Sequence, residues 1–573
     1  MQNKLNNLKK LIKPVIEFVS KHRWQILAFV ILAFILMTNT FHEKYPDEFD
    51  NIMGGKYILQ GVFPNSGFFT HHAPFAYFLS AGLLLFSGIS FVKFRVTLAI
   101  FYWLFHLGLF SYIKKTFSSK QATVSLLWSL LIALMATFDW SHMFLSDSLA
   151  GLFIVPTVMI LFFFNFEKKK LRFLDVGIIS ILLASTILTS ITYVFAVTII
   201  YVLLFATIIQ TDSFKYTFKN FLKFKLILAA PYLIFLLYLL LTNGFSDFYY
   251  QAIFFNKAYY VKSNGVEVSN PIRYAITIAV DYIRSYRAIL VQVLDFNLSY
   301  PFAITMAVAN TLIMFVLLFK KKYLLTFLLF GLTMFINVRS SIINIKETDY
   351  QSAPYHHLSL LFGILLIWLL INGIKNNKET FLKPIYYIFL VLFSSYLFYF
   401  TFFIFNSWMS KTYSKFMGEA PLIYDRPVIA PELNKILEDD DHYYIGPFAF
   451  EEHLYIKKGP KLASKYIITI PAIKKAVEVQ EQMIADIDET KPKIIVFDID
   501  FAIFSDPHPG DYFVSHLQNN YLTLGQITKE SDQYSLIRDK LEEYDLNSDI
   551  FIHKDYVDEM LLKLESIGWV EKQ

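Results

Sequence analysis

Long apolar runs dominate the chain and constrain its fold more than any other feature. They are 16 to 22 residues long and are separated by short loops rich in lysine and arginine. A helix of about 20 apolar residues crosses the hydrocarbon core of a bilayer, where the backbone must satisfy its own hydrogen bonds. With 55% hydrophobic residues in a chain of 573, the sequence predicts a polytopic α-helical membrane protein.

Basic clusters between the runs predict the direction of each crossing, because cytoplasmic loops carry an excess of lysine and arginine. All six clusters fall on one side only if the apolar run 74–91 stays in the first external loop, as a juxtamembrane or re-entrant segment. We therefore expect about eleven crossings, in a range of about 10 to 13, with the N-terminus cytoplasmic and the C-terminus external. The expected spans are 24–41, 95–113, 121–138, 148–166, 174–191, 193–210, 226–242, 301–319, 323–338, 357–373 and 384–405.

Three domains follow from this pattern. Residues 1–23 are expected to form a cytoplasmic interfacial helix, because leucine, isoleucine and valine share one helical face among lysines. Residues 24–405 are the expected transmembrane domain. Residues 406–573 alternate short β-like and helix-like runs, which predicts an external α/β domain. The β-like runs are 443–446, 494–497 and 521–524, and the helix-like runs are 471–488 and 556–567.

Two compositional features bear on chemistry and location. The chain has no cysteine, so disulfides are excluded and no thiolate can act as a nucleophile or metal ligand. Abundant Lys, Asn, Ile and Phe are typical of an AT-rich bacterial genome, and we expect the protein in the bacterial cytoplasmic (plasma) membrane.

The first external loop carries the motif on which a functional prediction depends. Two adjacent carboxylates follow the first span, and a short helix, a turn and a proline-led apolar helix follow them in order. The loop contains Tyr45-Pro46-Asp47-Glu48-Phe49-Asp50, Gly54-Gly55-Lys56-Tyr57, a turn over 61–64, and Thr70-His71-His72-Ala73-Pro74-Phe75.

This order of features resembles the GT-C superfamily of integral membrane glycosyltransferases, within it the protein-mannosyltransferase and aminoarabinose-transferase branch. The likeness is strong in the first external loop and loose over the whole topology. In the tail, Gly459-Pro460-Lys461, Lys491-Pro492-Lys493 and Asn520-Tyr521 are similar to the external domain of bacterial members. The resemblance implies a GT-C fold. It also implies inverting transfer of a sugar from a polyprenyl-phosphate donor to a lipid, glycan or protein acceptor at the outer face of the membrane.

The resemblance also implies roles for three carboxylates. Asp47 matches the residue that the family uses as base, which takes a proton from the acceptor hydroxyl. Glu48 and Asp147 are expected to shape the acceptor and donor sites. The adjacent carboxylates of Asp47 and Glu48 raise each other's pKa, which suits a base. The alternative is structural: Asp47 and Glu48 would favour the N-terminus of the helix near Phe49, and Ser146 with Asp147 would cap the next span. Asp139 is a weaker second candidate.

External cationic side chains are candidates to hold the donor phosphate, with anchoring of helix ends at the interface as the alternative. They are His72, Arg284, Arg287, Arg339, His356 and His357. His71 and His72 replace the Glu-Lys of the aminoarabinose-transferase branch, where the resemblance implies a metal ligand and a phosphate contact. A divalent metal is therefore compatible with the site but is not required by its residues, and His71 is the candidate ligand. Side chains of adjacent histidines are expected to point apart.

Rival interpretations remain open. The strand-like Val496-Phe497 followed by Asp498-Ile499-Asp500 could belong to a phosphatase or a nucleotide-sugar site, but carboxylates ending a core strand explain it better. A flippase or transporter for a lipid-linked glycan would need charges inside the spans, and the expected spans are almost free of them. A non-catalytic assembly protein gives no reason for the loop motif. No pattern indicates nucleic-acid binding.

Overall fold

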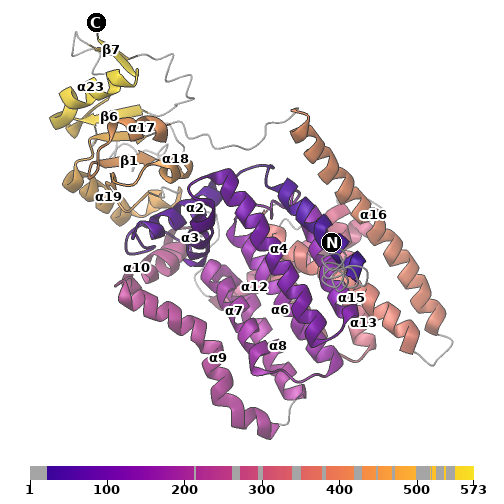
Figure 1. Cartoon of the computed structure of the whole chain (residues 1–573). Coiled ribbons are helices and arrows are strands. Elements are labelled where there is room, and N and C mark those ends of the chain that lie inside the picture. Colours follow the sequence, from indigo (N-terminus) through magenta and orange to yellow (C-terminus); the bar gives the residue numbers. More distant parts are fainter. Residues whose placement is uncertain are drawn as a thin grey trace, which may run out of the picture. The chain divides into compact units, whose positions relative to one another are not determined.

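The computed structural model describes residues 22–211, 214–260, 271–294, 301–337, 350–376, 382–418, 429–446, 449–467, 471–497, 517, 519–523, 534–536 and 549–572. It is largely helical, with a small sheet near the C-terminus (Figure 1). The chain divides into two compact units, which are described separately. Unit 1 holds 1–43, 92–228 and 276–423, and unit 2 holds 44–91, 229–275 and 424–573. The interfacial helix expected within 1–23 lies outside the described residues, apart from its last two positions.

A helix occupies each expected span, which confirms the multi-pass class. Seven described helices are long and apolar enough to cross a membrane, and α5, α7, α13 and α14 are shorter apolar helices. The bounds are His22–Asn39 for the first helix, then α4 Phe91–Thr116, α5 Ser119–Met135, α6 Ser146–Glu167, α7 Phe173–Thr189, α8 Val194–Thr211, α9 Phe214–Leu241, α13 Pro301–Phe319, α14 Tyr323–Phe335, α15 Ala353–Asn376 and α16 Leu382–Phe416. An additional helix, α12, spans Pro271–Leu294.

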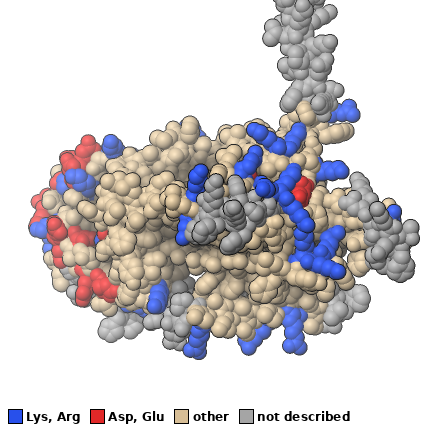
Figure 2. All heavy atoms as spheres, turned by 90° about the horizontal axis from the view of Figure 1, so that it is seen from below, with Lys and Arg blue, Asp and Glu red and all other residues tan. Residues whose placement is uncertain are grey.

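Basic residues meet at one end of the unit 1 helices. Lys114 Nζ donates to Gln25 Oε1 at 3.2 Å, which joins the end of α4 to the start of the first helix. Lys169 Nζ donates to the Thr116 carbonyl at 3.2 Å, which adds the loop before α7. Figure 2 shows lysine and arginine side chains gathered on the face that carries these helix ends. This grouping is the one that the positive-inside rule uses to mark a cytoplasmic end.

The start of α4 lies beside the end of the first helix, at the opposite end of the bundle. Arg95 donates to the carbonyl oxygens of His42 and Glu43 at 3.4 and 2.7 Å. Farther along, Trp103 Nε1 donates to the Phe29 carbonyl at 3.0 Å. The two helices are therefore antiparallel with matched ends, and the intervening segment 44–91 starts and finishes at the same end. The run 74–91 contains α3 (Phe75–Ser87) of unit 2, and its position outside the membrane stays a prediction.

Unit 2 contains a five-stranded mixed sheet in the order β2-β1-β3-β6-β4. β1 is parallel to β2 and β3, whereas β6 is antiparallel to β3 and β4. The strands are β1 His442–Gly446, β2 Lys461–Leu462, β3 Ile494–Phe497, β4 Tyr521–Thr523 and β6 Asp549–His553, with β5 Tyr534–Leu536 and β7 Val570–Lys572 as a separate pair. The helices are α17 Ala430–Ile436, α18 Phe450–Tyr455, α19 Val477–Thr490 and α23 Val557–Ser566. The expected α/β character of the tail is thus confirmed.

Alternation along the strands buries both faces of this sheet. Tyr443 and Ile445 on β1 pack in the cluster that includes Leu433 of α17 and Leu564 of α23. Their neighbour Tyr444 points to the other face, where its hydroxyl contacts Met483 of α19 at 3.3 Å. Side chains in a strand alternate between faces, so the sheet is covered by α17 and α23 on one face and by α19 on the other.

Three segments far apart in sequence form unit 2 together. The first loop contributes α2 (Pro46–Leu59) and α3 (Phe75–Ser87), and the middle of the chain contributes α10 (Phe245–Phe248) and a π-helix, Tyr249–Tyr260. Phe69 donates its backbone N–H to the Lys465 carbonyl at 2.8 Å, and Lys465 pairs with Asp247 at 3.2 Å. Tyr259 donates to Glu478 at 2.6 Å. The tail is therefore bonded to both loops.

Candidate functional site

Asp47 and Glu48 lie in the first turn of α2 and differ in burial. Glu48 is fully buried, whereas Asp47 is half-buried. The helix begins after Tyr45, without a side-chain capping bond, so neither carboxylate is the N-cap. Both remain in the turn where a negative charge is favoured by the helix dipole. Of the two, Asp47 is the carboxylate that solvent can reach.

A third carboxyl on α2, Asp50, was not among the predicted site residues. It is 3% exposed, and Tyr77 of α3 donates to its Oδ2 at 3.0 Å. Burial raises the pKa of Asp50 to about 8, with a further contribution from the charge of Asp47, while the Tyr77 hydrogen bond acts in the other direction. Asp50 thus keeps its proton at neutral pH. The signal in the sequence was its spacing of three residues from Asp47, which puts both on one helical face.

The Gly54-Gly55-Lys56-Tyr57 part of the motif is explained by packing. A Cβ on Gly54 would lie 2.3 Å from the Tyr77 ring, and one on Gly55 would lie 2.0 Å from Ser80 Oγ. Two glycines are therefore needed for α2 to approach α3.

Lys56 and Tyr57 connect α2 to the sheet. Lys56 is buried and donates to the carbonyl oxygens of His453 and Ile456 at 2.5 and 2.8 Å, at the end of α18. Tyr57 OH lies 3.2 Å from His453 Nδ1. These residues hold the carboxylate-bearing helix on the tail domain.

His71 and His72 do not point apart as expected. Their ring centroids are 3.9 Å from each other, and the His71 ring is 4.8 Å from that of Tyr260. The backbone explains this, because Thr70 Oγ1 accepts from the His72 N–H at 3.1 Å and Asn256 donates to the His71 carbonyl at 2.7 Å. Among the described residues, no group of three or more His, Asp or Glu side chains is arranged to hold a metal ion. A metal site at His71, which the resemblance implies, therefore stays a prediction.

In unit 1, Asp139 joins the two histidines at the start of α15. Its Oδ2 is 3.5 Å from His357 Nε2 and 3.9 Å from His356 Nδ1, and its Oδ1 accepts from the Ser141 N–H at 3.1 Å. All three ionisable side chains are buried. Burial alone would raise the pKa of Asp139, but the contacts with His357, His356 and Ser141 outweigh it and lower the pKa. The two rings and the Ser141 N–H thus surround the buried carboxylate.

Asp147 is buried in the first turn of α6 and accepts a short hydrogen bond from Tyr193. The alternative role as an N-cap is not observed, because α6 begins after Leu145 and has no side-chain capping bond. Asp47 and Glu48 belong to unit 2 and Asp147 to unit 1, so their meeting in one pocket stays a prediction.

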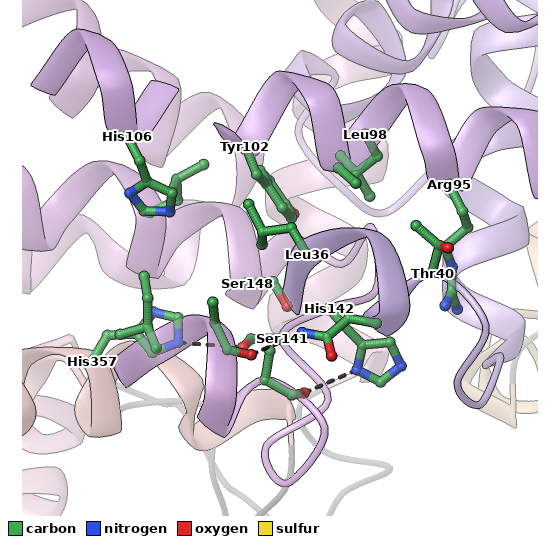
Figure 3. A pocket seen from close by; sticks show the side chains of 16 residues that line it. Leu36, Thr40, Arg95, Leu98, Tyr102, His106, Ser141, His142, Ser148 and His357 are labelled. Atoms are coloured by element: carbon green, nitrogen blue, oxygen red, sulfur yellow. Dashed lines mark hydrogen bonds between the residues drawn. The ribbon is translucent and has the colours of Figure 1, made fainter. Parts of the chain in front are cut away.

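A small cavity of about 40 Å³ lies between the first helix, α4, α5, α6 and α15 of unit 1. Figure 3 shows Arg95 and His142 toward one end and His106 and His357 toward the other. The space suits a few water molecules rather than a sugar. Burial lowers the pKa of His142 to about 3, helped by the charge of Arg95, so this histidine stays neutral.

Two buried cations and a partly buried one near this cavity were not predicted from the sequence. Arg95 is 1% exposed, Lys415 is buried and pairs with Glu43 at 3.7 Å, and the partly buried Lys411 donates to the Thr137 carbonyl at 2.6 Å. Each lies near the end of a long helix, where a basic residue is common and gives no sign of burial. A charge buried at the end of a span is a candidate for ligand binding.

The remaining phosphate candidates are less well placed or not described. Arg284 is 78% exposed and pairs with Asp281 at 3.5 Å, and Arg287 is also exposed on α12. Arg339 lies outside the described residues, as do Asp498 and Asp500 of the rival motif.

Comparison with known proteins gives a structural likeness without a family. No family model matches the chain, and no curated protein matches it. Two solved structures of ArnT from Cupriavidus metallidurans are similar to it. The one bound to undecaprenyl phosphate has a TM-score of 0.48 and 11% identity over 88% of this chain and 96% of that one. The apo structure has a TM-score of 0.46 and 12% identity over the same shares. A likeness at this level does not assign a family, so the proposal below rests on the chain's own residues.

Proposed function

We propose that the protein is a glycosyltransferase that moves a sugar from a polyprenyl-phosphate donor to a lipid, glycan or protein acceptor at the outer face of the membrane. The observation that carries the proposal is the α2 helix of the first external loop. There the half-exposed Asp47 follows the first span directly and is held, with buried Glu48, on a helix anchored to the tail domain. The same order of residues underlies the GT-C resemblance.

Asp47 is the base in this proposal. It takes the proton of the acceptor hydroxyl as the oxygen attacks the anomeric carbon from the face opposite the phosphate. The bond between that carbon and the phosphate oxygen breaks, and the electron pair leaves with the polyprenyl phosphate. Attack from the opposite face inverts the configuration. Glu48 and Asp147 shape the acceptor and donor sites.

The leaving phosphate needs positive or hydrogen-bonding groups. The Asp139–His356–His357 cluster supports such a role, because it places two imidazole rings with hydrogen-bonding nitrogens beside one carboxylate. Buried Arg95 and Lys415 lie at the same end of unit 1 as Glu43. His72, Arg284, Arg287 and Arg339 are further candidates.

The test is an Asp47→Asn substitution in cells. Deleting the protein should cause a lipid-linked sugar to accumulate, and mass spectrometry of extracted lipids would identify it. Asp47→Asn should reproduce that accumulation while the protein inserts at its normal level, because an amide cannot take the proton. The matched control is Asp440→Asn, whose carboxylate is 80% exposed and pairs with Lys461; it should behave as wild type.

The same experiment separates the rival functions. A scaffold protein should tolerate Asp47→Asn without any change in lipids. A flippase should accumulate its cargo on the cytoplasmic leaflet, whereas the enzyme leaves the donor exposed on the outer one. Normal lipids in the Asp47→Asn strain would overturn the proposal.

A further inference from the structure

Asp50 is a buried carboxyl that the proposed reaction leaves without a role. It lies three residues after Asp47 on α2, so the two side chains share a helical face. Its Oδ1 has no hydrogen-bond partner among the described residues. A buried carboxyl oxygen without a hydrogen bond costs free energy, and the cost is larger when the carboxyl is ionised.

A chain of hydroxyl groups holds the other oxygen of Asp50. Tyr77 OH donates to Oδ2 at 3.0 Å, and Tyr77 is itself 2.6 Å from Thr70 Oγ1. Gln251 of the π-helix accepts from the Thr70 N–H at 3.0 Å. Four elements of unit 2 therefore fix one buried carboxyl beside the candidate base.

We propose that Asp50 is a positioning residue for Asp47: it holds the proton of the carboxyl pair, so that the negative charge stays on Asp47. Two carboxyls on one helical face repel each other when both are ionised, and burial decides which of them keeps the proton. Asp50 is the buried member and Asp47 the half-exposed one. This inference rests on the proposed function, since it takes Asp47 as the base.

The other titratable groups around α2 are bonded elsewhere or lie on different segments. Lys56 bonds to the end of α18, where His453 contacts Tyr57. Glu48 lies in the first turn of α2, and His71 and His72, whose rings are tilted against each other, precede α3. On α3 the titratable side chain that faces Asp50 is Tyr77. Asp47 is the charge that raises the pKa of Asp50, after burial.

The first measurement is an infrared titration of the full chain in lipid nanodiscs. The wild type should show a protonated carboxyl band that disappears with a midpoint near pH 8. Asp50→Asn should remove the band. Asp47→Asn should move the midpoint to lower pH, because the neighbouring charge is gone. Ser80→Ala is the matched control: Ser80 bonds to the Asn51 carbonyl at 2.6 Å in the same α2–α3 contact, outside the Asp50 network.

The second measurement is the pH profile of turnover, with the lipid-linked sugar that accumulates in the deletion strain as donor. Above the midpoint, ionised Asp50 should repel both Asp47 and the donor phosphate. Wild-type turnover should then fall about tenfold per pH unit, as for loss of a single proton. Asp50→Asn should remove this alkaline fall, and Tyr77→Phe should move it to higher pH because the ionised carboxylate loses its donor.

The two ideas fail in different ways. If Asp47→Asn keeps full turnover, the proposed function fails. The coupling of the two carboxyls is tested separately, by the infrared midpoint of Asp47→Asn. If the protonated band survives in Asp50→Asn, or if its alkaline fall matches the wild type, the positioning role is wrong. Should Asp50→Asn fail to fold, the midpoint shift in Tyr77→Phe decides: an unchanged midpoint overturns the inference.

Discussion

Asp139 is a single carboxyl beside two consecutive histidines near the start of α15 in unit 1. Its Oδ2 is within 4 Å of both rings, and all three side chains are buried. A buried negative charge is tolerated only when cations or donors surround it. The two histidine rings are the groups beside this carboxylate, and their hydrogen-bonding nitrogens make the cluster a candidate phosphate site.

Replacing Asp139 by Asn should weaken donor binding. Without the carboxylate the histidines lose the negative partner that orients their rings, and a hydrogen bond to a charged group is worth about 1.5–3 kcal/mol. We expect the KM for the lipid-linked sugar to rise about tenfold or more, with a smaller change in kcat.

The control for this prediction is Ser129→Ala, which removes a hydroxyl 2.9 Å from His106 in the same helical bundle. It should leave the KM unchanged. An unchanged KM in Asp139→Asn would contradict a role of this carboxylate in donor binding.

At the scale of elements, α2 and α3 approach closely at two glycines. Gly54→Ala and Gly55→Ala should each destabilise the protein, because the new Cβ would meet the Tyr77 ring and Ser80. Overpacking of this kind costs about 1–3 kcal/mol, and here backbone atoms of α3 also stand in the way of Gly55. Thermal unfolding of the purified protein in detergent measures the loss.

Gly82→Ala is the matched control on α3, since nothing lies within 4 Å of a Cβ at that position. A helical glycine replaced by alanine in open space should raise stability by about 0.5–1 kcal/mol. Equal stability of the Gly54, Gly55 and Gly82 variants would show that the α2–α3 contact does not depend on the glycines.

Elements were more predictable from the sequence than their contacts. Apolar runs gave every span because helix length and lipid thickness are fixed by simple geometry. Three strands of the tail, β1, β3 and β4, followed from alternation, whereas β2, β5, β6 and β7 were not predicted. The partners of the candidate site did not follow: Asp50 meets Tyr77 at 27 residues' separation, and Lys56 meets His453 at 397. No local pattern encodes such pairs, since they arise only when α2 packs on α3 and on the tail.

Burial was also hidden from the sequence. Asp47, Glu48 and Asp50 all carry a carboxyl group, yet Asp47 is half-buried and the other two are buried. Arg95 and Lys415 lie near helix ends, where a basic residue is common and the sequence gives no sign of burial. The motif located the loop, but the roles within it depend on exposure, which only the packed helices determine.

At the scale of the whole molecule, the grouping of basic residues at one end of unit 1 predicts which end faces the cytoplasm. The chain has no native cysteine, so single cysteines report position cleanly. In intact cells a membrane-impermeant maleimide should label Lys458→Cys in the tail but not Lys120→Cys before α5. Both positions are exposed, so access to reagent rather than burial decides the result.

Breaking the cells should make Lys120→Cys reactive as well, which controls for the chemistry of that site. Labelling of Lys120→Cys in intact cells, with protection of Lys458→Cys, would invert the topology. It would also put the α2 carboxylates on the side where a polyprenyl-phosphate donor for external transfer is not presented.

The lysine of α2 that reaches the end of α18 ties the first loop to a domain encoded almost 400 residues later. In a hybrid that joins the tail of one homologue to the membrane part of another, the end of α18 can be displaced, and the buried lysine would then lose its two carbonyl partners. Such grafts should succeed only when both segments are inherited together. The tail and the first loop therefore fold as one unit, and hybrids that exchange the tail alone should misfold.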